Sequence, residues 1–267
     1  MTKTVLSIKD LSITFTQYGR LLTPFRSTPI ETLDLDIKKG ELLAIIGASG
    51  SGKSLLAHAI MGILPRNAEV SGQMIYRGQA LTPQRMKQIR GKEITLIPQS
   101  VNYLDPSMKV KHQVRLGISK NAQQVQEELF DQFGLTKADG ELYPFQLSGG
   151  MLRRVLFTTC LGEQVSLIIA DEPTPGLHPD ALQMVLKQLR AFADQGISVM
   201  FITHDIIAAS QIADRITVFK DGRAIETAPA HYFSGDGDNL QTAFARKLWR
   251  SLPQHAFLKG VSDDLRS

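Results

Sequence analysis

The feature that most constrains this chain is a glycine-rich turn between an apolar run, Leu42 to Ile46, and a stretch with helical spacing, Lys53 to Ile63. The turn matches G-x-x-x-x-G-K-[ST] at every position and reads Gly47-Ala48-Ser49-Gly50-Ser51-Gly52-Lys53-Ser54. In a strand–turn–helix setting, successive backbone N–H groups wrap phosphate oxygens and the helix N-terminus adds a favourable dipole. The sequence therefore predicts a phosphate-binding loop on an α/β fold.

The loop assigns chemistry to particular residues. Lys53 is expected to reach the β- and γ-phosphates of a nucleotide, and the Ser54 hydroxyl is expected to bind Mg²⁺. The residues that we expect to contact the nucleotide here are Gly47, Ser49, Gly50, Ser51, Gly52, Lys53, Ser54 and Leu55.

Apolar runs and helical stretches alternate along most of the chain, which predicts a parallel sheet covered on both faces. Strands are expected near residues 4–16, 32–37, 41–46, 70–77, 94–97, 166–170, 198–202 and 215–219, and helices near 53–63, 82–90, 149–162, 179–194, 205–213 and 238–252. Residues 17–31 contain Gly19, Pro24 and Pro29, which favour a connecting loop. From about residue 105 to 143, frequent Gln and Glu with helical patterning indicate an inserted helical subdomain.

Composition excludes several classes of protein. The 267 residues include 30 basic and 26 acidic residues, a balance that argues against disorder and gives no reason to expect a nucleic-acid partner. The longest apolar run is far shorter than the roughly 20 residues of a membrane span, and the N-terminus does not resemble a signal peptide. The single cysteine, Cys160, fits a reducing cytosol and a place in the core.

Two further motifs add to the phosphate loop. Asp171 and Glu172 follow a buried-type strand, where one carboxylate can hold Mg²⁺ and the next can activate water. The run from Leu147 to Met151 contains Ser148, Gly149 and Gly150 at a helix start, which forms a second anion-binding nest. A simple P-loop kinase does not need two such nests, and the chain contains no Asn-Lys-x-Asp motif, which disfavours a GTPase.

With these motifs in this order, the sequence resembles the ATP-binding subunits of ABC transporters over most of its length. Gln99 resembles the Q-loop glutamine, and the run Leu147-Ser148-Gly149-Gly150-Met151 resembles the signature motif. Asp171 and Glu172 match the Walker B pair, and His204 matches the switch histidine. Phe15 lies where the family places an adenine-stacking aromatic residue, with Tyr18 as the second choice.

The resemblance implies a P-loop (RecA-like) ABC ATPase core, an antiparallel β subdomain and an inserted α-helical subdomain. We expect a single domain over residues 1–267, with its core at about 1–100 and 149–235, the insert at 101–148 and a helical tail at 236–267. Glu172 would be the general base, and Lys53 and His204 would bind the γ-phosphate of ATP. Ser54, Gln99 and Asp171 would organise Mg²⁺.

The resemblance also implies an assembly. In the family, the signature turn contacts nucleotide bound by a second ATPase subunit. The expected partners are that subunit, two transmembrane permeases and an extracytoplasmic substrate-binding protein, with this chain at the cytoplasmic face of the membrane. Met151 and the tail from Leu248 to Pro253 resemble the importer branch for oligopeptides, dipeptides or nickel. An exporter ATPase and a soluble, non-transport ABC ATPase are the alternatives.

One position departs from the family pattern. After Walker B, the family has an aspartate in the loop that crosses the dimer interface, whereas this chain has His178. We therefore expect a heterodimer in which the partner supplies the usual loop; a neutral variation at this position is the alternative.

Overall fold

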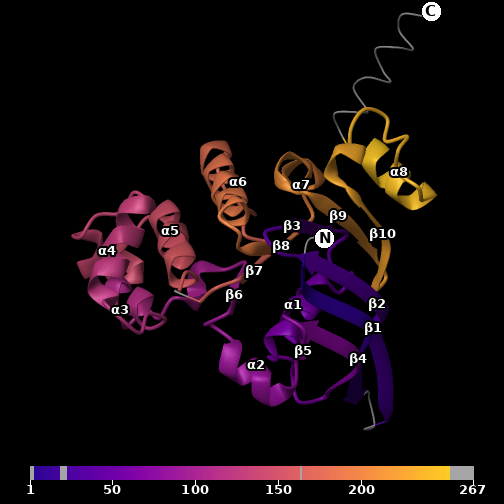
Figure 1. Cartoon of the computed structure of the whole chain (residues 1–267), viewed down its shortest axis with the longest axis horizontal. Helices are drawn as coiled ribbons and strands as arrows, with labels where there is room; N and C mark the ends of the chain where they lie inside the picture. Colours follow the sequence, from indigo (N-terminus) through magenta and orange to yellow (C-terminus); the bar gives the residue numbers. More distant parts are fainter. Residues whose placement is uncertain (1–2, 19–22, 163, 253–267) are drawn as a thin grey trace, which may run out of the picture.

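Two β-sheets organise the chain, and the computed structural model in Figure 1 describes residues 3–18, 23–162 and 164–252. The larger sheet has the strand order β10-β9-β3-β8-β7-β6. Its strands are β3 (Leu42–Ile46), β6 (Ile94–Ile97), β7 (Leu167–Asp171), β8 (Ser198–Thr203), β9 (Arg215–Lys220) and β10 (Arg223–Pro229). All neighbours pair in parallel except β9 and β10, which pair antiparallel. The predicted parallel sheet is confirmed, with one antiparallel strand added at its edge.

Both faces of this sheet are buried, as its almost wholly apolar strands require. Because successive side chains of a strand point to opposite faces, Leu42 and Ile46 of β3 join one core cluster while Leu43 and Ile45 join the other. The first cluster includes residues of α5 (Gly149–Thr159), α6 (Pro179–Asp194) and α7 (Ile206–Ile212), together with residues of three further helices introduced below, and the second includes residues of α1 (Lys53–Met61) and α2 (Pro83–Ile89).

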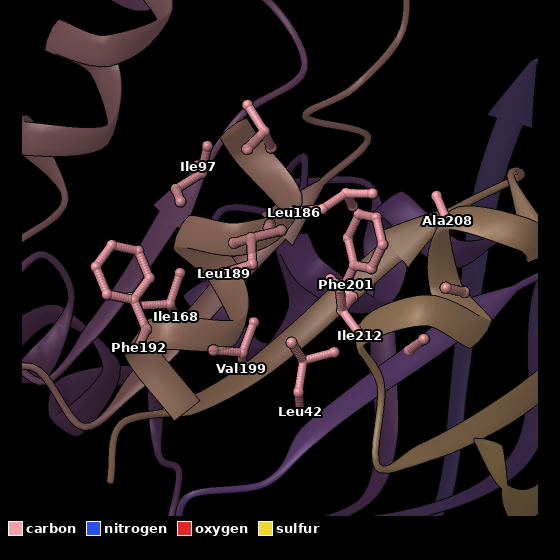
Figure 2. Packing of buried hydrophobic residues seen from close by; sticks show 14 of the residues in the cluster. Leu42, Ile97, Ile168, Leu186, Leu189, Phe192, Val199, Phe201, Ala208 and Ile212 are labelled. Atoms are coloured by element: carbon pink, nitrogen blue, oxygen red, sulfur yellow. The ribbon is translucent and has the colours of Figure 1, made fainter. Parts of the chain in front are cut away.

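Figure 2 shows how α6 covers its face of the sheet. Leu186, Leu189 and Phe192 lie on the side of the helix that faces Ile168 of β7 and Phe201 of β8. All five side chains are at most 1% exposed. This packing fixes the place where β7 ends and α6 begins, and the loop between them borders the site described below.

The smaller sheet is antiparallel, with the order β2-β1-β4-β5. Its strands are β1 (Thr4–Tyr18), β2 (Pro24–Lys38), β4 (Ala68–Tyr76) and β5 (Gln79–Ala80). The prediction of a loop over residues 17–31 was wrong, because β2 already begins at Pro24 and pairs with β1. Proline is tolerated there because β2 is an edge strand, whose free side needs no backbone donor.

A group of helices lies to one side of the sheets, at the left of Figure 1. It comprises α3 (Val110–Arg115), α4 (Ala122–Gln132) and α5, with α5 in contact with both others and with the core of the larger sheet. Phe133, just after α4, packs against Phe157 of α5 with ring centroids 6.3 Å apart. The phosphate-loop core and the helical group are thus joined through α5.

The last described helix is α8 (Ala243–Arg250), within the range expected to be helical near the C-terminus. Trp249 packs against Phe233 with ring centroids 6.0 Å apart, and its indole N–H donates to the Gly235 carbonyl. The predicted tail continues over residues 253–267, which lie outside the described residues. Across the described ranges, no helix combines the length and apolar character that a membrane crossing requires.

Candidate active site

The phosphate loop joins β3 to α1, and close backbone approach explains two of its glycines. A Cβ at Gly47 would lie 2.3 Å from the Phe219 carbonyl oxygen, and one at Gly52 would lie 2.8 Å from the Pro29 carbonyl oxygen. Gly52 also has φ 101° where it precedes α1, a left-handed conformation that glycine adopts without a Cβ clash. The fold therefore admits only glycine at these two positions.

The Lys53 side chain lies folded along the loop. Its ammonium group donates to the carbonyl oxygens of Gly47 and Ala48, both at 2.8 Å. Burial lowers the pKa of Lys53, and the nearby carboxylates of Glu172 and Asp171 oppose that shift. The cation is thus held inside the loop that would surround a phosphate group.

Ser54, at the end of the phosphate loop, and Asp171 of β7 form an oxygen pair. The Ser54 hydroxyl donates to Asp171 Oδ1 at 3.0 Å, at the end of β7. Burial raises the pKa of Asp171, and the hydrogen bond from Ser54 partly offsets this. A hydroxyl and a carboxylate suit Mg²⁺, which usually keeps waters and phosphate oxygens as its other ligands. The described residues include no group of three or more His, Cys, Asp or Glu side chains placed to hold a metal ion alone.

Glu172 and His204 are brought together from the ends of β7 and β8. His204 Nδ1 lies 2.6 Å from Glu172 Oε2. Glu172 has a positive φ of 48°, and its backbone N–H donates to the Ile202 carbonyl at 2.9 Å. The neighbouring strand thus holds the strained backbone that directs this carboxylate to its imidazole partner.

Lys53, Ser54, Glu172 and His204 border one pocket of about 370 Å³, whereas the predicted site residues Gly47, Ser51 and Asp171 are not part of its described lining. It is lined by Ser49, Gly50, Gly52, Lys53, Ser54, Leu55, Gln99, Glu172, Pro175 and His204. The pocket lies at the carboxyl ends of parallel strands, the usual ligand position in open α/β sheets. Pro175 was missed by the sequence analysis; its only signal was its place three residues after Glu172.

Several predicted residues lie elsewhere. None of Ser148, Gly149 and Gly150 lines this pocket as the structure describes it; all three are exposed at the start of α5, where Ser148 Oγ accepts from the Met151 N–H at 3.3 Å. Phe15 is 9% exposed and belongs to the core between the small sheet and the rest of the molecule. Its adenine-stacking role stays a prediction, and the side chain of Tyr18 lies outside the described parts.

Two single residues singled out by sequence have contrasting environments. Cys160 is buried, and burial raises the pKa of its thiol to about 12, which suits a core position. His178 precedes α6 with 82% of its side chain exposed and makes no capping hydrogen bond to the helix. Cys160 is thus inert packing, whereas His178 is available to a second molecule.

The geometry described above is that of an ATP-binding cassette. The ABC transporter family profile matches residues 30–175, more than half of the chain, and the chain belongs to this family. It is similar to the post-hydrolysis dimeric structure of the ATP-binding cassette MJ0796 bound to ADP and Pi, with a TM-score of 0.73 and 25% identity over 84% of this chain and 98% of that one. The predicted fold class and the predicted membership of the ABC transporter family are confirmed.

Curated relatives place the chain within the family. It is 33% identical to the metal-staphylopine import system ATP-binding protein CntD of Staphylococcus aureus (strain NCTC 8325 / PS 47), over 94% of this chain and 96% of that protein. It is also 33% identical to the oligopeptide transport ATP-binding protein OppD of Bacillus subtilis (strain 168), over 84% of this chain and 65% of that protein. The chain spans 48% and 65% of the length of two of the curated relatives that it matches.

Proposed function

We propose that this chain is the ATP-hydrolysing subunit of a membrane importer for peptides or metal complexes. One observation carries the hydrolytic part: a single pocket joins the phosphate loop with Lys53 to the Glu172–His204 pair. The import part is supported by similarity to proteins named for oligopeptide transport and for metal-staphylopine import.

The residues divide the reaction between them. Glu172 takes a proton from the attacking water, and His204, hydrogen-bonded to it, orients the carboxylate and reaches the γ-phosphate. Lys53 exchanges its contacts with loop carbonyls for contacts with phosphate oxygens. Ser54 and Asp171 would hold Mg²⁺, with Gln99 beside them, and the ion would neutralise charge on the phosphates.

The signature turn supports a dimer. Ser148, Gly149 and Gly150 are exposed and do not line the chain's own nucleotide pocket as the structure describes it, so they are available to contact nucleotide on a second ATPase subunit. We infer that this subunit is a different chain, because His178 departs from the usual interface aspartate. Two permeases and an extracytoplasmic binding protein complete the system, with this chain on the cytoplasmic face of the membrane.

Because the permeases and the binding protein select the cargo, this chain is consistent with a class of cargo: oligopeptides, dipeptides, or nickel and other metals as complexes. The test is mild-detergent purification of the tagged chain from its native membranes, with mass spectrometry of what co-purifies. We expect two multi-span proteins and a second, different ATPase. Recovery with ribosomes or nucleic acid, or of the chain alone, would overturn the transport role.

A further inference from the structure

A second pocket, of about 290 Å³, lies where α4, α5 and α6 meet. It is bordered by Phe133 and Gly134 after α4, by Arg153 and Phe157 of α5, and by further residues of α6. In the structure as described, it shares no lining residue with the nucleotide pocket. Nothing in the proposed reaction uses it.

Two of its lining side chains carry buried hydrogen-bond donors without acceptors. Within the described residues, Arg153 Nε and Gln188 Nε2 are fully buried and have no hydrogen-bond partner. Arg153 as a whole is only 9% exposed. Buried donors of this kind are uncommon in native proteins and each costs stability until an acceptor reaches it. The Gln188 amide turns about a soft terminal torsion, so a small rotation can present its donor to a bound acceptor.

The charge and shape of the lining define the acceptor. Arg153 and Arg154 are both present, and the lining given by the structure includes no aspartate or glutamate. Arg154 is engaged by the carbonyls of Phe133 and Gly134, whereas the Arg153 guanidinium retains an unused N–H. Phe133 and Phe157 supply aromatic surface beside these donors. A ligand with an apolar body and one anionic group would match both the hydrogen-bond donors and the aromatic surface of this pocket.

We propose that this pocket binds a small carboxylate with an aromatic or aliphatic body of about a dozen heavy atoms. The size follows because a cavity of roughly 150 Å³ already holds benzene, and this pocket is nearly twice that volume. The carboxylate accepts from Arg153 and Gln188, and the body lies against Phe133 and Phe157. Arginine suits this role because the N–H donors of its planar guanidinium match the geometry of a carboxylate.

Arg153 also links the pocket to the nucleotide site. Its Nη1 donates to the backbone carbonyl of Gln99 at 3.1 Å, and Gln99 lines the nucleotide pocket. A ligand that pulls on the guanidinium therefore biases the position of Gln99. This link rests on the proposed function, whereas the pocket itself does not.

The first experiment measures binding directly, on the full chain without nucleotide. Naphthoate is titrated by calorimetry and by ligand-observed NMR, beside the neutral analogue naphthyl methanol and the smaller benzoate. We expect saturable binding at one site per chain, with naphthoate at least about tenfold tighter than the alcohol, because the carboxylate makes charge-assisted hydrogen bonds. No saturable binding of either carboxylate at millimolar concentration, or equal affinity for acid and alcohol, would overturn the proposal.

Three variants place the site. Met184→Trp puts a bulky ring at an exposed position of the pocket lining, and it should abolish naphthoate binding. Gln183→Trp is the matched control: it adds the same side chain at the adjacent exposed position outside the lining, and it should bind normally. Arg153→Met should remove the preference for acid over alcohol. Naphthoate binding that survives Met184→Trp would assign the ligand to another place.

The link between this pocket and the nucleotide site is tested by measuring ATP affinity. Titration of ATP with and without saturating naphthoate should give dissociation constants that differ by about fivefold or more, the lower end of coupling between sites. By reciprocity, saturating ATP should change the naphthoate constant by the same factor. Naphthoate binding with unchanged ATP affinity would overturn the link through Arg153 while leaving the pocket assignment in place. Absence of ATP binding by the chain without naphthoate would instead count against the proposed function.

Discussion

At the scale of single residues, the pair of carboxylates at the end of β7 separates into two environments. Asp171 is buried and bonded to Ser54, whereas Glu172 turns away on a left-handed backbone toward His204. Adjacent side chains at the end of a strand point to different sides, so a metal-holding carboxylate and a proton-accepting carboxylate can be neighbours in sequence. We therefore expect different effects from substituting Glu172 and from substituting Asp171.

For Glu172→Gln we expect intact ATP binding and a loss of turnover of about 10²–10⁴-fold, the usual contribution of a general base. The amide keeps the size of the side chain but cannot accept the proton. ATP affinity and steady-state phosphate release are measured side by side. Glu128→Gln, at an exposed position of α4, is the control and should match the wild type. Turnover within about tenfold of the wild type would remove Glu172 from the role.

For Asp171→Asn we expect a changed dependence of stability on pH in the nucleotide-free chain. Because burial raises the pKa of Asp171 in the folded state, the ionised carboxylate opposes folding. The contribution of Asp171 to the stability of the folded chain is therefore greatest below the ordinary aspartate pKa, and it is lost as pH rises through the raised pKa. The amide still accepts the Ser54 hydroxyl and never ionises, so the variant should gain melting temperature at pH 7 but not at pH 4. Parallel curves for both proteins would contradict this reasoning.

At the scale of elements, the start of α8 is held by a buried carboxylate. Glu226 of β10 is 9% exposed and accepts from the backbone N–H groups of Gln241 and Thr242 at 2.7 and 2.8 Å, and from the Thr242 hydroxyl. Burial alone would raise the pKa of Glu226, but these hydrogen bonds outweigh it and lower the pKa. The carboxylate thus ties the helix that carries the single tryptophan to the large sheet.

We expect acid to release this helix before the rest of the chain unfolds. A lowered folded-state pKa means that Glu226 contributes stability above the ordinary glutamate pKa of about 4.3 and loses it as pH falls through the lowered value. Trp249 packs on Phe233, so its fluorescence reports the change while far-ultraviolet circular dichroism follows the whole chain. Glu226→Gln should show the released signal already at pH 7. Coincident fluorescence and circular-dichroism transitions in both proteins would argue against a separate release.

The elements also show what a sequence can and cannot predict. The phosphate loop and the Asp171–Glu172 pair were predictable because their spacing and flanking strands encode the chemistry locally. The edge strand from Pro24 was not, because its prolines are tolerated only through its position at the sheet edge. Likewise, nothing local in the sequence pairs Glu226 with Thr242 or Arg153 with Gln99. Those contacts exist only once distant segments have packed.

At the scale of the whole molecule, the loop between β7 and α6 presents His178 to a second subunit. Its side chain is 82% exposed, and its closest acidic partner is Asp180, at 3.9 Å. In the assembly that we propose, an aspartate at this position would accept hydrogen bonds across the interface. Histidine has no carboxylate and therefore cannot accept these hydrogen bonds in the same way. The coupling of the two ATP sites should therefore depend on this residue.

His178→Asp tests this in the purified complex. We expect the ATPase rate to change by about fivefold or more, at the lower end of coupling between sites. The substitution also places a good cap before α6, where the histidine makes no capping hydrogen bond, and this alone should stabilise the isolated chain by about 1 kcal/mol.

His178→Ser separates the two effects, because serine caps a helix about as well as aspartate but brings no carboxylate to the interface. We expect both variants to raise the melting temperature of the isolated chain and only His178→Asp to alter the rate of the complex. Equal rates for wild type, His178→Asp and His178→Ser would show that the histidine is a neutral variation. The two ATP sites would then be coupled through other residues of the interface.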